Sequence, residues 1–122
     1  MDLNHLYLVV RDVDRSVEFY RRFFGFDGPS EWQGETFVVH NDEGFALSLT
    51  PGDSPPPWPG ELHFGFLLES VDEARSLRTL MESAGHRMVE AYEEPGFVVF
   101  KVLDPDGYLV EVEAGVPVSP PP

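Results

Sequence analysis

The sequence contains no cysteine and only 8 lysine and arginine residues, against 22 aspartate and glutamate residues. Without cysteine there is no disulfide framework and no thiolate chemistry, so a metal site would have to use histidine, carboxylate or neutral oxygen ligands. The net charge of −14 argues against nucleic-acid binding, which needs clustered basic side chains to neutralise phosphates. It mildly favours cationic or neutral partners, although its simplest role is to keep the protein in solution.

The chain also lacks an apolar run of the roughly 18 to 20 residues that a membrane-spanning helix needs. Its N-terminal segment has no basic region followed by an apolar core. We therefore expect no secretory signal peptide, no membrane partner and a cytoplasmic location. At 122 residues the sequence is long enough for one domain with a substantial core.

An internal repeat is the main feature that the sequence does have. The stretches LNHLYLVV and ELHFGFLL both have the character of apolar strands, with a histidine near the start of each. The interval between His5 and His63 equals the interval between Asp14 and Asp72, which lie at the start of two helical patterns. The chain therefore predicts two modules of the same design.

Each module is predicted to run as strand, helix and about three further strands, which is an α+β fold. Asp14 is the expected N-cap of the first helix, and Gly25 its end. The second helix is expected to open with the capping box SVDE at 70–73 and to end at Gly85. The expected strands lie at 3–10, 26–32, 36–40, 45–50, 61–68, 87–92, 97–103 and 108–113.

The two predicted modules form one domain at 1–114, followed by a tail at 115–122. Module one covers 3–50 and module two covers 61–114. The proline-rich segment between them, 51–60, is expected to be a stiff connector, because proline fixes φ and removes a hydrogen-bond donor.

Three residues of the predicted strands could hold a metal ion. Strand side chains alternate between faces, so His5, His63 and Glu111 could converge on one face of a curved sheet. Two imidazole nitrogens and a carboxylate suit Mn, Fe, Co, Ni or Zn, and three protein ligands leave positions open for a substrate. The simpler alternatives are satisfied strand histidines and a solvated glutamate; the repeat favours the metal site because it relates His5 to His63.

The stretches NHLYLVVRDVDRSVEFYRRFFGF and LDPDGYLVEVEA resemble the opening and closing signatures of the vicinal oxygen chelate superfamily. That superfamily includes glyoxalase I, extradiol dioxygenases, fosfomycin-modifying enzymes and bleomycin-resistance proteins. The resemblance implies paired βαβββ modules whose mixed sheets curve into a cup around a metal ion, and a homodimer. It matches His5, His63 and Glu111 to the metal ligands and places Ser48 at the remaining ligand position.

Ser48 separates this chain from the isomerases of the superfamily, because a serine hydroxyl is a poor ligand and cannot replace a displaceable carboxylate base. The resemblance implies a divalent-metal-dependent enzyme, of lyase, isomerase or dioxygenase type, acting on a small oxygen-chelating metabolite or drug. Seven of the eight basic residues lie in or beside the predicted helices and leave Lys101 as the strand cation, which disfavours a phosphonate such as fosfomycin. The alternative is a non-catalytic protein of the bleomycin-resistance type that sequesters a cationic or aromatic small molecule.

Hydroxyl, cationic and aromatic side chains near the predicted site are candidates for contacting the small molecule. These candidates are Tyr7, Trp32, Ser48, Trp58, Tyr92 and Lys101. Tyr7 shares a strand face with His5, whereas Trp32 and Trp58 lie in segments with loop character. The two tryptophans could stack on a flat or cationic ligand, although packing is the simpler role of such side chains.

Overall fold

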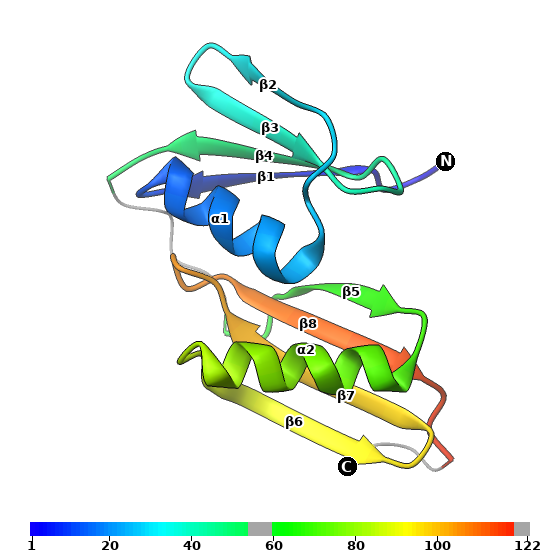
Figure 1. Ribbon diagram of the computed structural model, residues 1–122. Coiled ribbons are helices and arrows are strands. Elements are labelled where there is room, and N and C mark those ends of the chain that lie inside the picture. The colour runs from blue at the N-terminus through cyan, green and yellow to red at the C-terminus, as the bar shows by residue number, and fades with distance from the viewer. Residues whose placement is uncertain (54–59, 119–122) are drawn as a thin grey trace. The chain divides into compact units, whose positions relative to one another are not determined.

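The computed structural model describes residues 1–53 and 60–118, and the chain divides into two compact units, Met1–Pro57 and Trp58–Pro122. Each unit has one helix lying against one face of a four-stranded sheet (Figure 1). Trp58 and most of the predicted connector lie outside the described residues. Neither helix of the described segments has the length and apolar character to cross a bilayer.

The first unit follows the predicted order of strand, helix and three strands. Its elements are β1 (His5–Val10), α1 (Val13–Phe24), β2 (Ser30–Gln33), β3 (Thr36–His40) and β4 (Ala46–Pro51). The sheet order is β1-β4-β3-β2, with β1 parallel to β4 and the other neighbours antiparallel.

The second unit repeats this topology. Its elements are β5 (Phe64–Leu68), α2 (Val71–Ser83), β6 (Met88–Glu94), β7 (Phe97–Leu103) and β8 (Leu109–Gly115). The sheet order is β5-β8-β7-β6, again with the first and last strands parallel. The predicted α+β fold of paired βαβββ modules with mixed sheets is therefore confirmed.

Both helices begin at a polar cap. The Asp12 side chain accepts a hydrogen bond from the Arg15 backbone N–H at 3.2 Å, so the predicted N-cap at Asp14 is wrong. Asp14 lies in the first turn, where its charge meets the positive end of the helix dipole. In the second unit Ser70 accepts from the Glu73 N–H at 3.0 Å, as the capping box predicts.

The strands β3 and β7 match their predicted bounds, whereas two other predictions need correction. β2 begins at Ser30 rather than near residue 26, because Phe26 is fully buried and its N–H bonds the carbonyl of Tyr20 beyond the end of α1. β5 begins at Phe64, so His63 precedes the strand by one residue instead of lying within it.

The core of each unit lies between its helix and the facing side of its sheet. In the first unit, α1 contributes Phe19, Tyr20 and Phe23, and the sheet contributes Leu8, Val10, Leu47 and Leu49. In the second unit, α2 contributes Ala74 and Met81, and the sheet contributes Val98, Phe100, Val102, Val110, Val112 and Ala114. The alternating side chains of the same strands form the opposite, helix-free face of each sheet.

Candidate functional site

The helix-free face of the second unit brings His63 and Glu111 together. His63 Nε2 lies 3.5 Å from Glu111 Oε2, and the two side chains are 31% and 25% exposed. His63 Nδ1 lies 3.0 Å from the backbone carbonyl of Glu61. A carbonyl only accepts, so Nδ1 carries a proton and Nε2 is the ring nitrogen that a metal ion would bind.

Gly65 makes room for the Glu111 carboxylate. The two residues are register partners on the parallel strands β5 and β8. A Cβ atom at Gly65 would lie 3.1 Å from both Glu111 Cβ and the Glu111 backbone oxygen, and 3.4 Å from Glu111 Oε2. Glycine therefore leaves the carboxylate in place beside His63, which a larger side chain at this position would disturb.

The geometry of this pair fits two ligands of one ion. Ligand atoms each about 2.1 Å from one ion and at a tetrahedral angle lie about 3.4 Å apart, which is close to the separation of His63 Nε2 and Glu111 Oε2. One imidazole nitrogen and one carboxylate oxygen are donors that first-row divalent metals accept. Within the described residues no group of three or more histidine, cysteine, aspartate or glutamate side chains gathers as a metal cluster.

His5 has a matching environment in the first unit. It is the first residue of β1, it is exposed, and its Nδ1 lies 2.9 Å from Asn4 Oδ1. As at His63, a neighbouring oxygen holds Nδ1, so Nε2 is the nitrogen that can bind a metal. The predicted relation between the two histidines therefore extends to the hydrogen bond that orients each ring.

Tyr7 and Ser48 are register partners in the first unit, at the position that Gly65 and Glu111 hold in the second. Tyr7 lies with Thr50 and Thr36 on the helix-free face, where the Thr36 hydroxyl donates to Thr50 at 3.1 Å. Hydrogen bonds with the side chains of Thr50 and then Thr36 lower the pKa of Tyr7, and outweigh the opposite effects of burial and the charge of Glu35.

The helix-free face of the second unit also holds a cavity of about 410 Å³. Tyr92 and Lys101 line it, as does Glu111, so three predicted site residues share one cavity within this unit. Lys101 Nζ lies 3.0 Å from Glu90 Oε2, and the Tyr92 hydroxyl donates to Glu94 Oε2 at 2.9 Å. Both polar groups are thus already engaged by carboxylates of β6.

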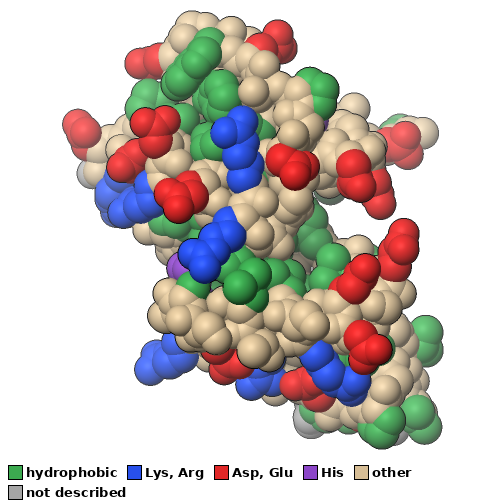
Figure 2. Space-filling model, viewed as in Figure 1, with side chains coloured by type: hydrophobic (Ala, Val, Ile, Leu, Met, Phe, Trp, Pro, Cys, Tyr) green, Lys and Arg blue, Asp and Glu red, His purple; other side chains and the backbone are tan. Residues whose placement is uncertain are grey.

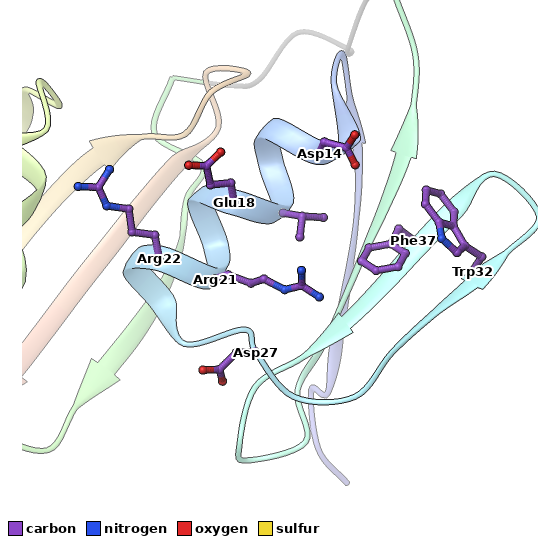
Figure 3. A pocket seen from close by; sticks show the side chains of 8 residues that line it. Asp14, Glu18, Arg21, Arg22, Asp27, Trp32 and Phe37 are labelled. Atoms are coloured by element: carbon purple, nitrogen blue, oxygen red, sulfur yellow. The ribbon is translucent and has the colours of Figure 1, made fainter.

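Trp32 lies on the helix side of the first sheet, away from the face that carries His5, Tyr7 and Ser48. Its ring centroid is 4.7 Å from that of Phe37. The two rings line a broad cavity of about 780 Å³ with side chains of α1 (Figure 3). Within the first unit, the structure therefore places Trp32 on the opposite face of the sheet from His5.

The charged groups of the surface are mixed in sign. The face shown in Figure 2 carries acidic and basic side chains interspersed over both units, without a broad basic patch on that face. Arg75 bonds Glu93 and the carbonyl of Glu94, and Arg78 bonds Glu82 and Glu93. These arginines of α2 are therefore engaged by acidic neighbours in the second unit.

The chain matches a known protein family over most of its length. Residues 2–112 match the model of the Glyoxalase/Bleomycin resistance protein/Dioxygenase superfamily. The chain belongs to this superfamily. The match covers both units, in agreement with the resemblance seen at the two ends of the sequence.

Proteins similar to this chain include a glutathione transferase and a possible glyoxalase. The chain is 29% identical over 115 residues to a glutathione transferase FosA of Serratia marcescens, covering 93% of this chain and 80% of that protein. A possible glyoxalase from Bacillus cereus is 28% identical, with a TM-score of 0.77 and coverage of 92% and 97% of the two chains. A Listeria monocytogenes FosX variant, complexed with Mn(II) and a dihydroxypropylphosphonic acid, shares the fold at 19% identity, a TM-score of 0.76 and coverage of 94% and 93%.

Sequence reasoning missed several residues around Glu111 and Lys101 in the second unit. Glu90 neutralises Lys101 across β6 and β7, Gly65 accommodates Glu111, and Glu113 lines the cavity beside it. The alternation along YLVEVE already placed Glu113 on the face of Glu111, so this residue was within reach of the sequence. The Glu90–Lys101 pairing was not, because a register shift in β6 between Met88 and Glu90 decides it.

Proposed function

We propose that the chain is a divalent-metal-dependent enzyme that acts on a small molecule chelating the ion through neighbouring oxygens. The observation that carries this proposal is the pair of His63 Nε2 and Glu111 Oε2, which lie 3.5 Å apart, with Glu111 also lining the cavity of about 410 Å³. Membership of a superfamily with glyoxalase and fosfomycin-modifying members supports it. When bound, a divalent ion would supply Lewis acidity toward the oxygens of the substrate.

His5 is proposed as the third ligand, together with His63 and Glu111. Its support is the repeat itself: both rings present Nε2 and hold Nδ1 on a neighbouring oxygen. Ser48 is not proposed as a ligand, because a neutral hydroxyl binds such ions weakly. We also propose the homodimer that the superfamily resemblance implies; mixing His5→Ala with His63→Ala chains would restore metal binding if one site draws ligands from two chains.

The chain's own residues would orient the substrate and hold protons. Ser48 offers no carboxylate at the position of Glu111, so proton abstraction by a displaceable glutamate is not part of this proposal. The Tyr7 hydroxyl is exposed and hydrogen-bonded with Thr50, and we assign it, on the first helix-free face, the role of donating a proton to a substrate oxygen. Phe97 and Val99 give the second unit's cavity an apolar wall that excludes water.

A second candidate function is drug sequestration without a metal, and the first unit's larger cavity favours it. Trp32 and Phe37 stand on one side of this cavity, and Asp14, Glu18 and Asp27 bring carboxylates to it (Figure 3). Arg21 and Arg22 also line it, and the Arg21 guanidinium lies 5.9 Å from the centre of the Phe37 ring. The lining thus combines aromatic rings with charges of both signs, which suits a flat aromatic ligand with polar groups. Binding at this cavity would be insensitive to chelators, which separates it from the metal-dependent proposal.

The test is elemental analysis of protein purified without chelators, followed by calorimetric titration with Mn²⁺, Ni²⁺ and Zn²⁺. We expect stoichiometric binding in the wild type and its loss in His63→Ala, with the circular dichroism spectrum unchanged. His40→Ala is the matched control: the His40 ring bonds the Pro29 carbonyl in the first unit, so its removal should leave the stoichiometry intact. A wild type that binds none of the three ions would sink the proposal.

A further inference from the structure

Two cross-strand rows of side chains cross the helix-free face of the second unit. The first row runs through Gly65, Glu111, Lys101 and Glu90, which are successive register partners on β5, β8, β7 and β6. The second row lies two residues further along β8 and runs through Leu67, Glu113, Val99 and Tyr92. The first row is polar and charged, whereas the second has one carboxylate among apolar and aromatic neighbours.

Each charged side chain of the first row has a polar neighbour. Lys101 is held by Glu90 at 3.0 Å, and Glu111 stands beside His63 in the proposed metal site. Glu113 has no such match: it is partly buried and lines the cavity, and no described residue gives its carboxylate a hydrogen bond or an ion pair. Its register partners on the neighbouring strands, Leu67 and Val99, are both apolar and offer the carboxylate no polar group.

The fold itself does not require a charge at this place. The equivalent residue of the first unit is Thr50, whose neutral hydroxyl accepts from Thr36. The same strand, with the same register toward its parallel partner, therefore forms with a neutral residue that is satisfied within its own sheet. The carboxylate of Glu113 is a property of the second unit's cavity rather than of the βαβββ module.

We propose that Glu113 sets the specificity of the site by binding a cationic nitrogen of the substrate. This inference rests on the proposed function, since Glu111 and His63 would hold the ion that the substrate chelates. Two residues along a strand span about 7 Å, so the substrate would carry an ammonium or guanidinium group about that far from its chelating oxygens. A cavity of about 410 Å³ accommodates a molecule of this size, with an apolar or aromatic body against Val99 and Tyr92.

The same charges disfavour an anionic substrate group at this place. Lys101 is the basic residue among those that line the cavity, and Glu90 already neutralises it. A phosphonate would meet Glu113 with no free cation beside it. The proposed substrate is therefore a chelating amine and differs in charge from the phosphonic acid bound by the Listeria relative.

The probes that test this inference are three catechols that differ in the charge of one side arm. Dopamine carries an ammonium, 4-ethylcatechol is neutral, and 3,4-dihydroxyphenylpropionate is an anion. Calorimetric titration of the Mn²⁺-loaded protein should show dopamine binding about tenfold more tightly than 4-ethylcatechol, the scale of a charge-assisted hydrogen bond. The anion should bind more weakly than either.

Glu113→Gln should remove the preference for dopamine while leaving the affinity for 4-ethylcatechol and Mn²⁺ unchanged. Glu69→Gln, the same change on an exposed residue outside the cavity, should keep the wild-type preference. Equal affinities for the two catechols in the wild type, or a preference that survives Glu113→Gln, would overturn the inference and leave the metal proposal standing.

A separate arm keeps the inference testable if the protein binds no metal. The metal-free protein is titrated with 2-phenylethylammonium and with 2-phenylethanol, which share a ring and differ in charge. A preference for the ammonium that Glu113→Gln removes would support Glu113 although the proposed function had failed. Indifference to the charge would overturn the inference on its own.

Discussion

The two units share one topology and differ where their first and last strands meet. In the first unit the register partners are Tyr7 and Ser48, and in the second they are Gly65 and Glu111. The large side chain is on the first strand of one unit and on the last strand of the other. Each pair thus combines one long side chain with one short one on the helix-free face.

This exchange shows how a duplicated scaffold separates roles. The second unit uses its space for a carboxylate beside His63, and the first uses the equivalent space for a phenol hydrogen-bonded with Thr50. Neither unit carries both a carboxylate and a phenol at this pair of register partners. The proposed chemistry therefore assigns metal binding chiefly to the second unit and proton donation to the first.

Replacing Glu111 by serine, the residue at the equivalent position of the first unit, should have the largest effect on metal binding. Glu111→Ser removes the anionic oxygen from the proposed site. Losing a residue that only supports a metal ligand lowers metal affinity by up to about 100-fold, so losing the ligand itself should lower the affinity for Mn²⁺ by at least about that factor. Ser48→Ala is the control and should leave the affinity unchanged. Calorimetric titration checks both, and an unaltered affinity in Glu111→Ser would show that this carboxylate does not bind the ion.

Filling the space opposite Glu111 should have an intermediate effect. In Gly65→Ala the new Cβ would approach Glu111 Cβ to 3.1 Å, so the carboxylate must shift and the affinity for Mn²⁺ should fall about tenfold. Gly60→Ala, whose Cβ would meet nothing within 4 Å, is the matched control. The free energy of unfolding should change by less than about 1 kcal/mol in both; a large loss of stability in Gly65→Ala would mean that the glycine serves the strand rather than the site.

The smallest effect concerns the phenol of the first unit. Hydrogen bonds with Thr50 and Thr36 stabilise the phenolate, so Tyr7 should ionise at lower pH than an ordinary tyrosine. Thr50→Val should raise the pKa of Tyr7 back toward its usual value, and Thr50→Ser should not. The measurement is the ultraviolet titration of the metal-free protein, with Tyr7→Phe identifying the contribution of this residue; a titration curve that Thr50→Val leaves in place would contradict it.

Local signals in the sequence predicted the fold well. Alternation and turn residues gave the bounds of β3 and β7, and the capping box gave the start of α2. The N-cap of α1 was misplaced because Asp12 and Asp14 are equally good caps by type, and only the backbone shows which side chain reaches the free N–H of Arg15. The late start of β2 depends on the burial of Phe26, which is a tertiary effect.

The candidate site was predictable in part. Alternation placed Glu111 on the helix-free face, and the repeat related His63 to His5, but the distance between His63 and Glu111 depends on the register of β5 with β8. The engagement of Lys101 by Glu90 depends on an irregular stretch of β6 that no residue type announces. The ligand roles of His5, His63 and Glu111, the single-domain organisation and the homodimer stay predictions.

The hydrogen bonds that orient the two imidazole rings differ in how they respond to substitution of neighbouring residues. His63 is fixed by a main-chain carbonyl, which remains whatever side chain stands at residue 61. His5 is fixed by the amide of Asn4, whose oxygen and nitrogen exchange places when the side chain rotates. A single substitution at residue 4 can therefore alter which nitrogen of the first ring carries the proton. The Nδ1 hydrogen bond of His63 does not depend on the side chain at residue 61, so a substitution there changes it only if the backbone moves.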